Sequence, residues 1–200
     1  MTSNNEPDRT TIDFANKYPN LFQKATWPRR LGDTMAQFKL DKNLPPTHLI
    51  STVHMAPRIK DDWVLVQFED GTWEYPGGGT EPSESYLEAL KREMMEEAGA
   101  VLRTFQIIGA WYCHSLANHP RKPHMPHPDT IILIGTGEVE LVQKPTNPDN
   151  AEQIVEVACV PLEIAIQRFL SMGRKDVAEL YQLAAELGTA NEIPIERYDL

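Results

Sequence analysis

Residues 76–100 read PGGGTEPSESYLEALKREMMEEAGA, a glycine-rich turn followed by a helical segment that ends in a cluster of carboxylates. At about 100° per residue, Glu93, Glu96 and Glu97 share one face of that helix. Carboxylates placed so closely repel one another unless a cation lies between them. Acids are also unfavourable at the C-terminal end of a helix, where the macrodipole prefers cations. The spacing therefore predicts a divalent-metal site, and a metal site suggests phosphate chemistry.

A solvated, glutamate-rich helix end is the simpler interpretation of these three acids taken alone. The glycine loop and the register of Glu84 and Arg92 favour the metal site instead. Three consecutive glycines, residues 77–79, allow positive φ and a close approach of the loop to the helix. A backbone carbonyl of that loop is then a further candidate ligand.

The helix itself is expected to begin at Glu84, with Ser83 as its N-cap, and to run to about Ala98. Gly99 is expected to end it in the left-handed conformation. An apolar stripe lies beside the acids, so the helix can pack on a sheet while the acids face a groove. The stripe consists of Leu87, Leu90, Met94 and Ala98.

The same stretch resembles the Nudix box over residues 78–100, with every fixed position filled. The order of the predicted elements is similar to that family more loosely, over about residues 47–172. The fixed positions are Gly78, Glu84, Arg92, Glu93, Glu96, Glu97 and Gly99, and the two apolar positions hold Met94 and Ala100.

The resemblance implies an α/β/α sandwich with a mixed β-sheet. It also implies a hydrolase that cleaves a diphosphate bond in a nucleoside diphosphate linked to another moiety. Mg²⁺ would be the cofactor, with Mn²⁺ as a substitute. Glu93, Glu96 and Glu97 would be both metal ligands and catalytic residues.

Arg92 also belongs to the expected catalytic set. A guanidinium does not lose its proton, so we expect Arg92 to orient a carboxylate of the motif and not to act as a base. Gly78, Glu84 and Gly99 are expected to serve the geometry of the motif more than its chemistry.

The general base remains open at this stage. Glu152 and Glu156, close to a late predicted strand, are candidates, and so is a histidine of the loop described below. An ordinary surface carboxylate is the alternative interpretation of Glu152.

Composition is typical of a globular chain with one compact domain, since 41% of the 200 residues are hydrophobic. A net charge of −10 argues against broad binding to nucleic acid or to anionic membranes. Cys113 and Cys159 are expected to be buried thiols. No signal peptide opens the chain and no run is long enough to span a membrane, so we expect a cytoplasmic protein.

Four regions are expected: a disordered tail (1–10), an N-terminal extension packed on the core (11–46), a Nudix domain (47–172), and a C-terminal helix with a tail (173–200). The extension shows helical spacing interrupted by Pro19. It either covers the domain or forms a dimer interface or a pocket wall, where Arg29 and Arg30 could reach a phosphate. Strands are predicted at 48–55, 63–68, 72–75, 101–112, 130–142 and 154–160, and helices at 162–170 and 175–187.

Residues 114–129 form a long loop rich in proline and histidine. It is either a solvated loop or a lid whose Arg121, Lys122 and histidines contact phosphate. A zinc site is a third alternative, although carboxylate-rich sites favour Mg²⁺ or Mn²⁺. Trp111, just before the loop, is either a core residue or a surface on which a base stacks.

Two other functions are consistent with this fold. One is a regulatory module that binds a nucleotide without turnover, and the other is a metal-dependent isomerase of a non-nucleotide diphosphate. A complete set of motif carboxylates favours the hydrolase. The identity of the diphosphate stays open, and a homodimer is a further expectation from the resemblance.

Overall fold

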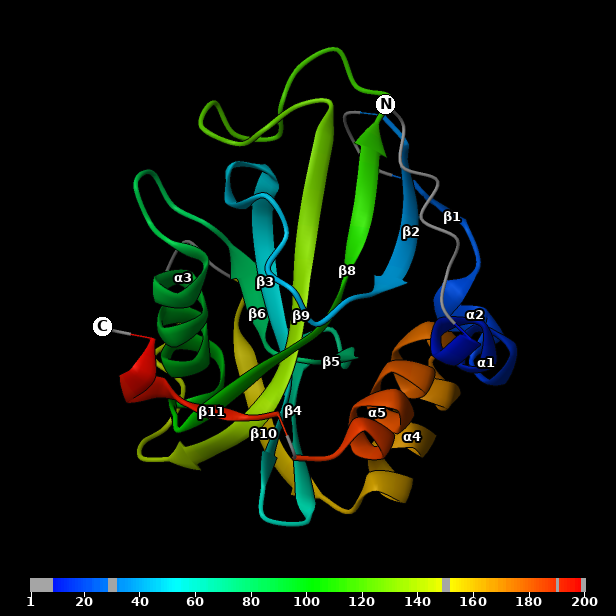
Figure 1. Ribbon diagram of the computed structural model, residues 1–200. Coiled ribbons are helices and arrows are strands. Elements are labelled where there is room, and N and C mark those ends of the chain that lie inside the picture. The colour runs from blue at the N-terminus through cyan, green and yellow to red at the C-terminus, as the bar shows by residue number, and fades with distance from the viewer. Residues whose placement is uncertain (1–8, 29–31, 149–151, 190, 199–200) are drawn as a thin grey trace.

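The computed structural model describes residues 9–28, 32–148, 152–189 and 191–198 (Figure 1). Most of these residues surround one large mixed β-sheet. Its main path runs in the order β1-β2-β8-β9-β3-β4-β10. The strands of this path are β1 (Ala25–Trp27), β2 (Thr34–Leu40), β8 (Thr104–Ser115), β9 (Asp129–Leu141), β3 (Ile50–Ile59), β4 (Asp62–Phe68) and β10 (Ile154–Val160).

The central pair, β3 and β9, is parallel, whereas the other pairs along the path are antiparallel. Short strands extend four members of the path. They are β5 (Trp73–Glu74) along β4, β6 (Gly77–Gly79) along β3, β7 (Ala100–Leu102) along β9, and β11 (Ile193–Pro194) along β8. The glycine segment therefore lies beside the centre of the sheet, where β3 fixes its position.

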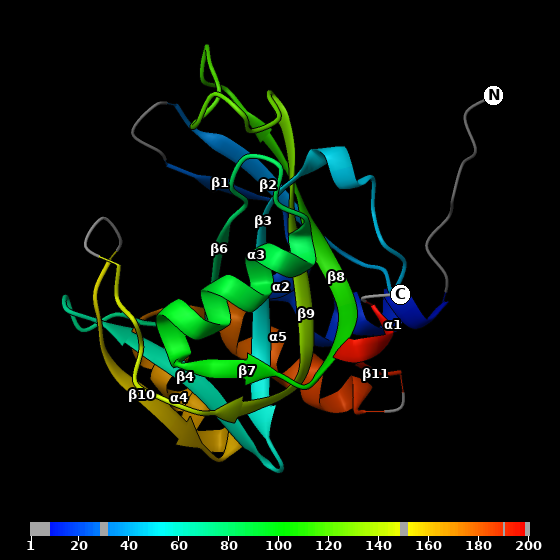
Figure 2. The same cartoon turned by 90° about the vertical axis from the view of Figure 1, so that its left-hand side faces the viewer.

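Helices cover both faces of the sheet, as Figures 1 and 2 show. On one face, α3 (Tyr86–Glu93) and the π-helix η2 (Met94–Ala98) pack Leu90 and Met94 against Phe105. On the other face, α2 (Pro19–Phe22), α4 (Leu162–Ser171) and α5 (Lys175–Leu187) enclose a second core that contains Phe38 and Tyr181. The expected α/β/α sandwich with a mixed sheet is confirmed.

The N-terminal extension contains more regular structure than its sequence pattern predicts. A first helix, α1 (Arg9–Lys17), precedes α2, so the last two residues of the expected disordered tail are helical. The extension then adds β1 and β2 to the main sheet through pairing with β8. Arg29 and Arg30 lie outside the described residues.

Two further predictions need correction. The expected strand 101–112 is divided at Arg103, whose N–H bonds to the Glu138 carbonyl, and β8 then continues to Ser115. Cys113 is buried as expected, but Cys159 is exposed because it lies on the outer strand β10.

The C-terminal segment returns to the sheet and is held there by a part-buried ion pair. Arg58 donates to both carboxylate oxygens of Glu192 at 2.6 and 2.7 Å, and Thr104 donates to the same carboxylate. The 3₁₀-helices η1 (Thr47–Leu49) and η3 (Ile195–Arg197) complete the described elements. Within the described parts of the chain, none of the helices combines the length and the apolar character needed to cross a membrane.

Candidate functional site

The acidic helix begins two residues later than the sequence pattern predicts. Ser85 is the N-cap, because its hydroxyl accepts from the Glu88 N–H while the Glu88 carboxylate accepts from the Ser85 N–H. Ser83, the predicted N-cap, instead has a positive φ of 67° in the turn before the helix. This capping box fixes where α3 enters the site.

The far end of the helix widens into the π-helix η2 before Gly99 ends it. As predicted, Gly99 is left-handed, with φ 61° and ψ 32°. A Cβ on Gly99 would also lie 2.1 Å from the Gln143 carbonyl oxygen. Single π turns inside helices are uncommon overall, but those that occur are often found at functional sites. Here the π turn carries Glu96 and Glu97.

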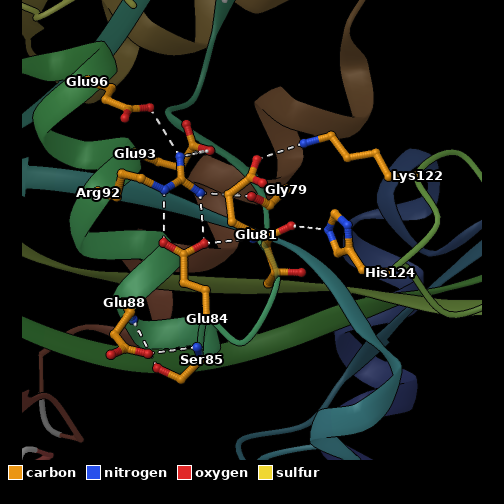
Figure 3. Close-up of polar contacts among 11 residues, drawn as sticks. Gly79, Glu81, Glu84, Ser85, Glu88, Arg92, Glu93, Glu96, Lys122 and His124 are labelled. Carbon is orange, nitrogen blue, oxygen red and sulfur yellow. Dashed lines mark hydrogen bonds and ion pairs between the residues drawn. The ribbon is translucent and has the colours of Figure 1, made fainter.

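Arg92 is the centre of the polar contacts around the motif (Figure 3). Its guanidinium binds Glu84 through two bonds of 2.9 and 3.0 Å and donates to the Gly79 carbonyl at 2.9 Å. The same side chain contacts Glu93 at 2.7 Å and Glu96 at 3.1 Å. Arg92 thus ties the glycine loop to the acids, which is an orienting arrangement and not that of a base.

Glu93 and Glu97 are held in partly desolvated positions. Burial raises the pKa of Glu93, an effect that the Arg92 guanidinium opposes. Burial also raises the pKa of Glu97 to about 8, although this carboxylate accepts the Gly77 N–H at 2.9 Å. The negative charges of Glu93, Glu152 and Glu96 add to the rise in the pKa of Glu97. A cation at this position would relieve both the burial cost and the repulsion.

The three glycines of β6 separate the acids from the other side of the sheet. A Cβ on Gly78 would lie 2.2 Å from a carboxylate oxygen of Glu93. On the neighbouring positions, a Cβ on Gly77 would lie 2.3 Å from the Val53 carbonyl oxygen and 2.8 Å from the His54 ring, and one on Gly79 would lie 2.9 Å from the Met125 methyl. Successive residues of a strand face opposite sides, so β6 fits between these groups only because it has no side chains.

The donor chemistry of the cluster fits a hard divalent cation, because carboxylate oxygens are the ligands such ions prefer. In the described residues, however, no group of three or more histidine, cysteine, aspartate or glutamate side chains is arranged to hold a metal ion. Glu93 and Glu96 share the Arg92 guanidinium as their counter-charge. Binding of a metal would therefore require these two carboxylates to turn away from Arg92.

The two candidate bases occupy different positions. Glu152 is close enough to Glu97 for its charge to raise the pKa of that group, and it borders an open pocket that also exposes Glu74. Glu156 is exposed on β10, where its Cα is paired with Gln67. Glu152 thus lies within electrostatic range of Glu97, whereas Glu156 is not among the charges that raise the pKa of Glu97 most.

A cavity of about 560 Å³ lies beside β6, bounded by β2, β3, β8, β9 and the loop 116–128. Its wall includes Ser51 and Thr52, and Thr52 is the residue paired with Gly79. The cavity therefore lies next to the Gly79 end of β6, while neither β6 nor the three motif acids contribute to its lining. Its other lining residues include Trp27, Thr34, Cys113, Arg121, Met125, Thr130 and Ile132.

The three predicted substrate contacts have separate surroundings. Arg121 is exposed at the cavity and, among the described residues, forms no ion pair. Lys122 instead binds Glu81 at 2.8 Å. Trp111 is 4% exposed and does not line the cavity, because Trp27 packs edge-on against it with a ring separation of 5.0 Å.

The loop histidines are engaged in local contacts. His124 bonds to the Thr80 carbonyl at 2.8 Å, His127 to the Ala117 carbonyl, and His114 to Asp129. The sequence did not single out Trp27 or Met125 as cavity residues, nor did it indicate the ion pair between Lys122 and Glu81. An unexplained tryptophan in a segment too apolar for a tail was the signal for Trp27, whereas nothing local marks the other two.

Comparison with known proteins gives one family. The NUDIX domain model matches residues 52–183, more than half of the chain. The "Putative 8-oxo-dGTP diphosphatase YtkD" of Bacillus subtilis (strain 168) is 39% identical over 54 residues, which cover 27% of this chain and 34% of that protein. A "Nucleoside triphosphate pyrophosphatase/Nudix hydrolase fusion protein" of Bifidobacterium longum (strain NCC 2705) is 27% identical over 123 residues, or 61% of this chain and 23% of that protein.

The chain thus spans about a third and about a quarter of the length of these two curated relatives. Among solved structures, a NUDIX hydrolase from Nitrosomonas europaea matches with a TM-score of 0.50 and 21% identity. That match covers 74% of this chain and 95% of the other. It supports the fold.

Proposed function

The chain belongs to the NUDIX-domain family, and from this membership we propose that it is a metal-dependent hydrolase of a diphosphate bond. The substrate class is a nucleoside diphosphate linked to another moiety. The observation that carries the proposal is the acidic end of α3 and η2. There Glu93 and Glu97 lie partly desolvated against a strand of three glycines, a placement that is costly without a bound cation.

Glu93, Glu96 and Glu97 are the proposed ligands of Mg²⁺, with Mn²⁺ as a substitute. When bound, the ion would neutralise charge on the diphosphate and lower the pKa of the attacking water. Arg92 fixes the glycine loop through Gly79 and Glu84, and it holds Glu93 and Glu96 on the same side of the helix until an ion replaces it as their counter-charge. It acts as a positioning residue.

The cavity beside β6 is the proposed place for the group attached to the diphosphate. Its wall offers the ring of Trp27 and the apolar side chains of Met125 and Ile132, which suit a flat, largely apolar group. Arg121 has no carboxylate partner among the described residues, so it can contact a phosphate. Because Trp27 lines the cavity, it is a stronger candidate for stacking on a bound group than the buried Trp111.

Glu152 is the preferred candidate for the general base, because it is the one of the two whose charge acts on Glu97. Glu152→Gln should lower kcat far more than Glu156→Gln. Equal kcat values for these two variants would contradict the assignment.

The test of the proposed function is a turnover screen over a panel of diphosphates with Mg²⁺ and with Mn²⁺. Glu97→Gln should lower kcat by about 10³-fold or more while thermal unfolding shows that the fold is retained. Glu163→Gln, which alters an exposed glutamate on α4, is the matched control and should be as active as the wild type. Near-normal turnover in Glu97→Gln would refute the metal assignment.

The same screen separates the two rival functions. Tight nucleotide binding without release of phosphate or of a nucleoside monophosphate would favour the regulatory module. Rearrangement of a non-nucleotide diphosphate without hydrolysis would favour the isomerase. Homodimer formation stays a prediction, to be checked by the mass of the protein in solution.

A further inference from the structure

The loop 116–128 contacts the glycine segment on the side opposite to the acids. Met125, 7% exposed, packs on Gly79, where a Cβ would lie 2.9 Å from its methyl group. His124 bonds to the Thr80 carbonyl at 2.8 Å, and Lys122 binds Glu81 at 2.8 Å. Because a carbonyl oxygen can only accept, the ring nitrogen of His124 is the donor. The glycine segment is taken here as residues 77–81, that is, β6 and the two residues after it. Three of its successive residues, Gly79, Thr80 and Glu81, are thus held by one loop.

The same segment is held from the other side by the motif helix. Arg92 donates to the Gly79 carbonyl, and the Glu81 N–H donates to Glu84 at 2.8 Å. Glu84 in turn is bound by Arg92, which also contacts Glu93 and Glu96. Figure 3 shows this continuous chain of contacts, from Lys122 and His124 through the glycine segment to the carboxylates.

The loop also forms part of the cavity wall, through Ala117, His119, Arg121, Met125 and others. Its position therefore affects two things at once: the space available to a ligand and the alignment of the segment that contacts Arg92. A long loop that is anchored at its middle by one buried side chain and two polar contacts has a defined closed position.

We infer that Lys122 and His124 are positioning residues that act on the motif carboxylates through residues 79–81. In this arrangement they do not contact the substrate diphosphate. Their contacts with Glu81 and Thr80 keep the glycine segment in the register that Arg92 requires. The kinetic consequence of the inference rests on the proposed function. The coupling between the loop 116–128 and residues 79–81 can be measured without turnover.

The first experiment measures amide hydrogen exchange in the metal-free protein. The Thr80 N–H bonds to the Ser51 carbonyl at 3.1 Å and the Glu81 N–H to Glu84, so both amides report the position of the segment. His124→Leu should raise exchange at both amides about fivefold. His124→Gln, which keeps a side-chain donor, should restore slow exchange. Asn118→Leu is the matched control, because it introduces the same side chain at an exposed position of the same loop.

The second experiment measures kcat and KM separately. His124→Leu should lower kcat about five- to tenfold with less than a twofold change in KM, and His124→Gln should recover most of kcat. Lys122→Met should lower kcat about two- to threefold, because the Lys122–Glu81 pair is partly exposed. It also provides a second variant if His124→Leu does not fold.

Unchanged amide exchange at Thr80 and Glu81 in His124→Leu and in Lys122→Met would overturn the inference. A kinetic defect confined to KM would also overturn it, because it would place these side chains on the substrate. A wild-type protein without turnover on any diphosphate would instead contradict the proposed function, while the exchange experiment would still decide whether the loop and the glycine segment are coupled.

Discussion

Gly78→Ala provides a sharp test of the packing between the glycine strand and the acids. The φ of Gly78 lies outside the left-handed region, so alanine fits the backbone and the added methyl is the main perturbation. That methyl would lie 2.2 Å from Oε1, 2.5 Å from Cδ and 2.8 Å from Oε2 of Glu93. Ordinary contact begins at 3.4 Å, so the carboxylate or the strand must move by about 1.2 Å.

The Glu93 carboxylate can turn more readily than the strand can shift, but turning breaks its ion pair with Arg92. Glu93 is 9% exposed and is held by Arg92 at 2.7 Å, while β6 is bonded to β3. Overpacking of this kind lowers the free energy of unfolding by about 1–3 kcal/mol. A displacement of about 1 Å at a catalytic group costs about 10²-fold in rate. We therefore expect a moderate loss of stability in urea unfolding and a fall in kcat of about 10²-fold.

Two controls isolate the clash. In a Glu93→Ala background, Gly78→Ala should have almost no effect on the free energy of unfolding, because the conflicting atoms are gone. Gly71→Ala strains a positive φ but meets nothing within 4 Å, so it should destabilise the protein and leave kcat unchanged. The reasoning is refuted if Gly78→Ala keeps kcat within twofold of the wild type, or if its cost persists without Glu93.

Three other predictions concern stability. Ser85→Ala should lower the free energy of unfolding by about 1 kcal/mol through loss of the capping box, whereas Ser83→Ala should not; a thermal scan that ranks them in the reverse order would contradict the observed helix start. Burial lowers the pKa of His54 to about 4, so the protonation of this group in the unfolded state removes about 3 kcal/mol of stability as pH drops from about 6.5 to 4, while the raised pKa of Glu97 acts in the opposite direction; the free energy of unfolding of the wild type minus that of His54→Gln should therefore fall over that range, and a constant difference would exclude the effect. Arg58→Met should cost about 1–3 kcal/mol because it leaves the part-buried Glu192 with Thr104 as its remaining side-chain donor, and Arg58→Met with Glu192→Met should recover much of that loss in the same unfolding assay.

Local sequence patterns predicted those helices and strands whose own residues show a clear period or residue preference. The strand 154–160 agrees with the structure because it is rich in β-branched residues, and the helix 175–187 agrees because its apolar period is unbroken. The helix start was misplaced because two serines compete for the N-cap. Glu88 decides between them, since it lies three residues after Ser85 and completes the capping box.

Other parts of the fold depend on contacts that no local pattern specifies. Ala36 and Phe38 alternate with polar residues in β2, yet their partner strand β8 lies some seventy residues further along the chain. The cavity likewise combines Trp27 from the extension with Met125 from the distant loop. Arg92 was expected to orient one carboxylate of the motif, but the sequence did not indicate that it would pair with Glu84, Glu93 and Glu96 together.

The absence of side chains on β6 also has a genetic consequence. A Cβ on Gly77 would meet the backbone of β3 at Val53 and His54, one on Gly78 would meet Glu93 on α3, and one on Gly79 would meet Met125 in the loop. In a library of random variants all three codons would tolerate little change. Second-site suppressors of Gly79→Ala should arise at Met125, and those that restore folding to Gly78→Ala should arise at Glu93, so the map of suppressors would trace the side chains that pack on the two faces of this strand.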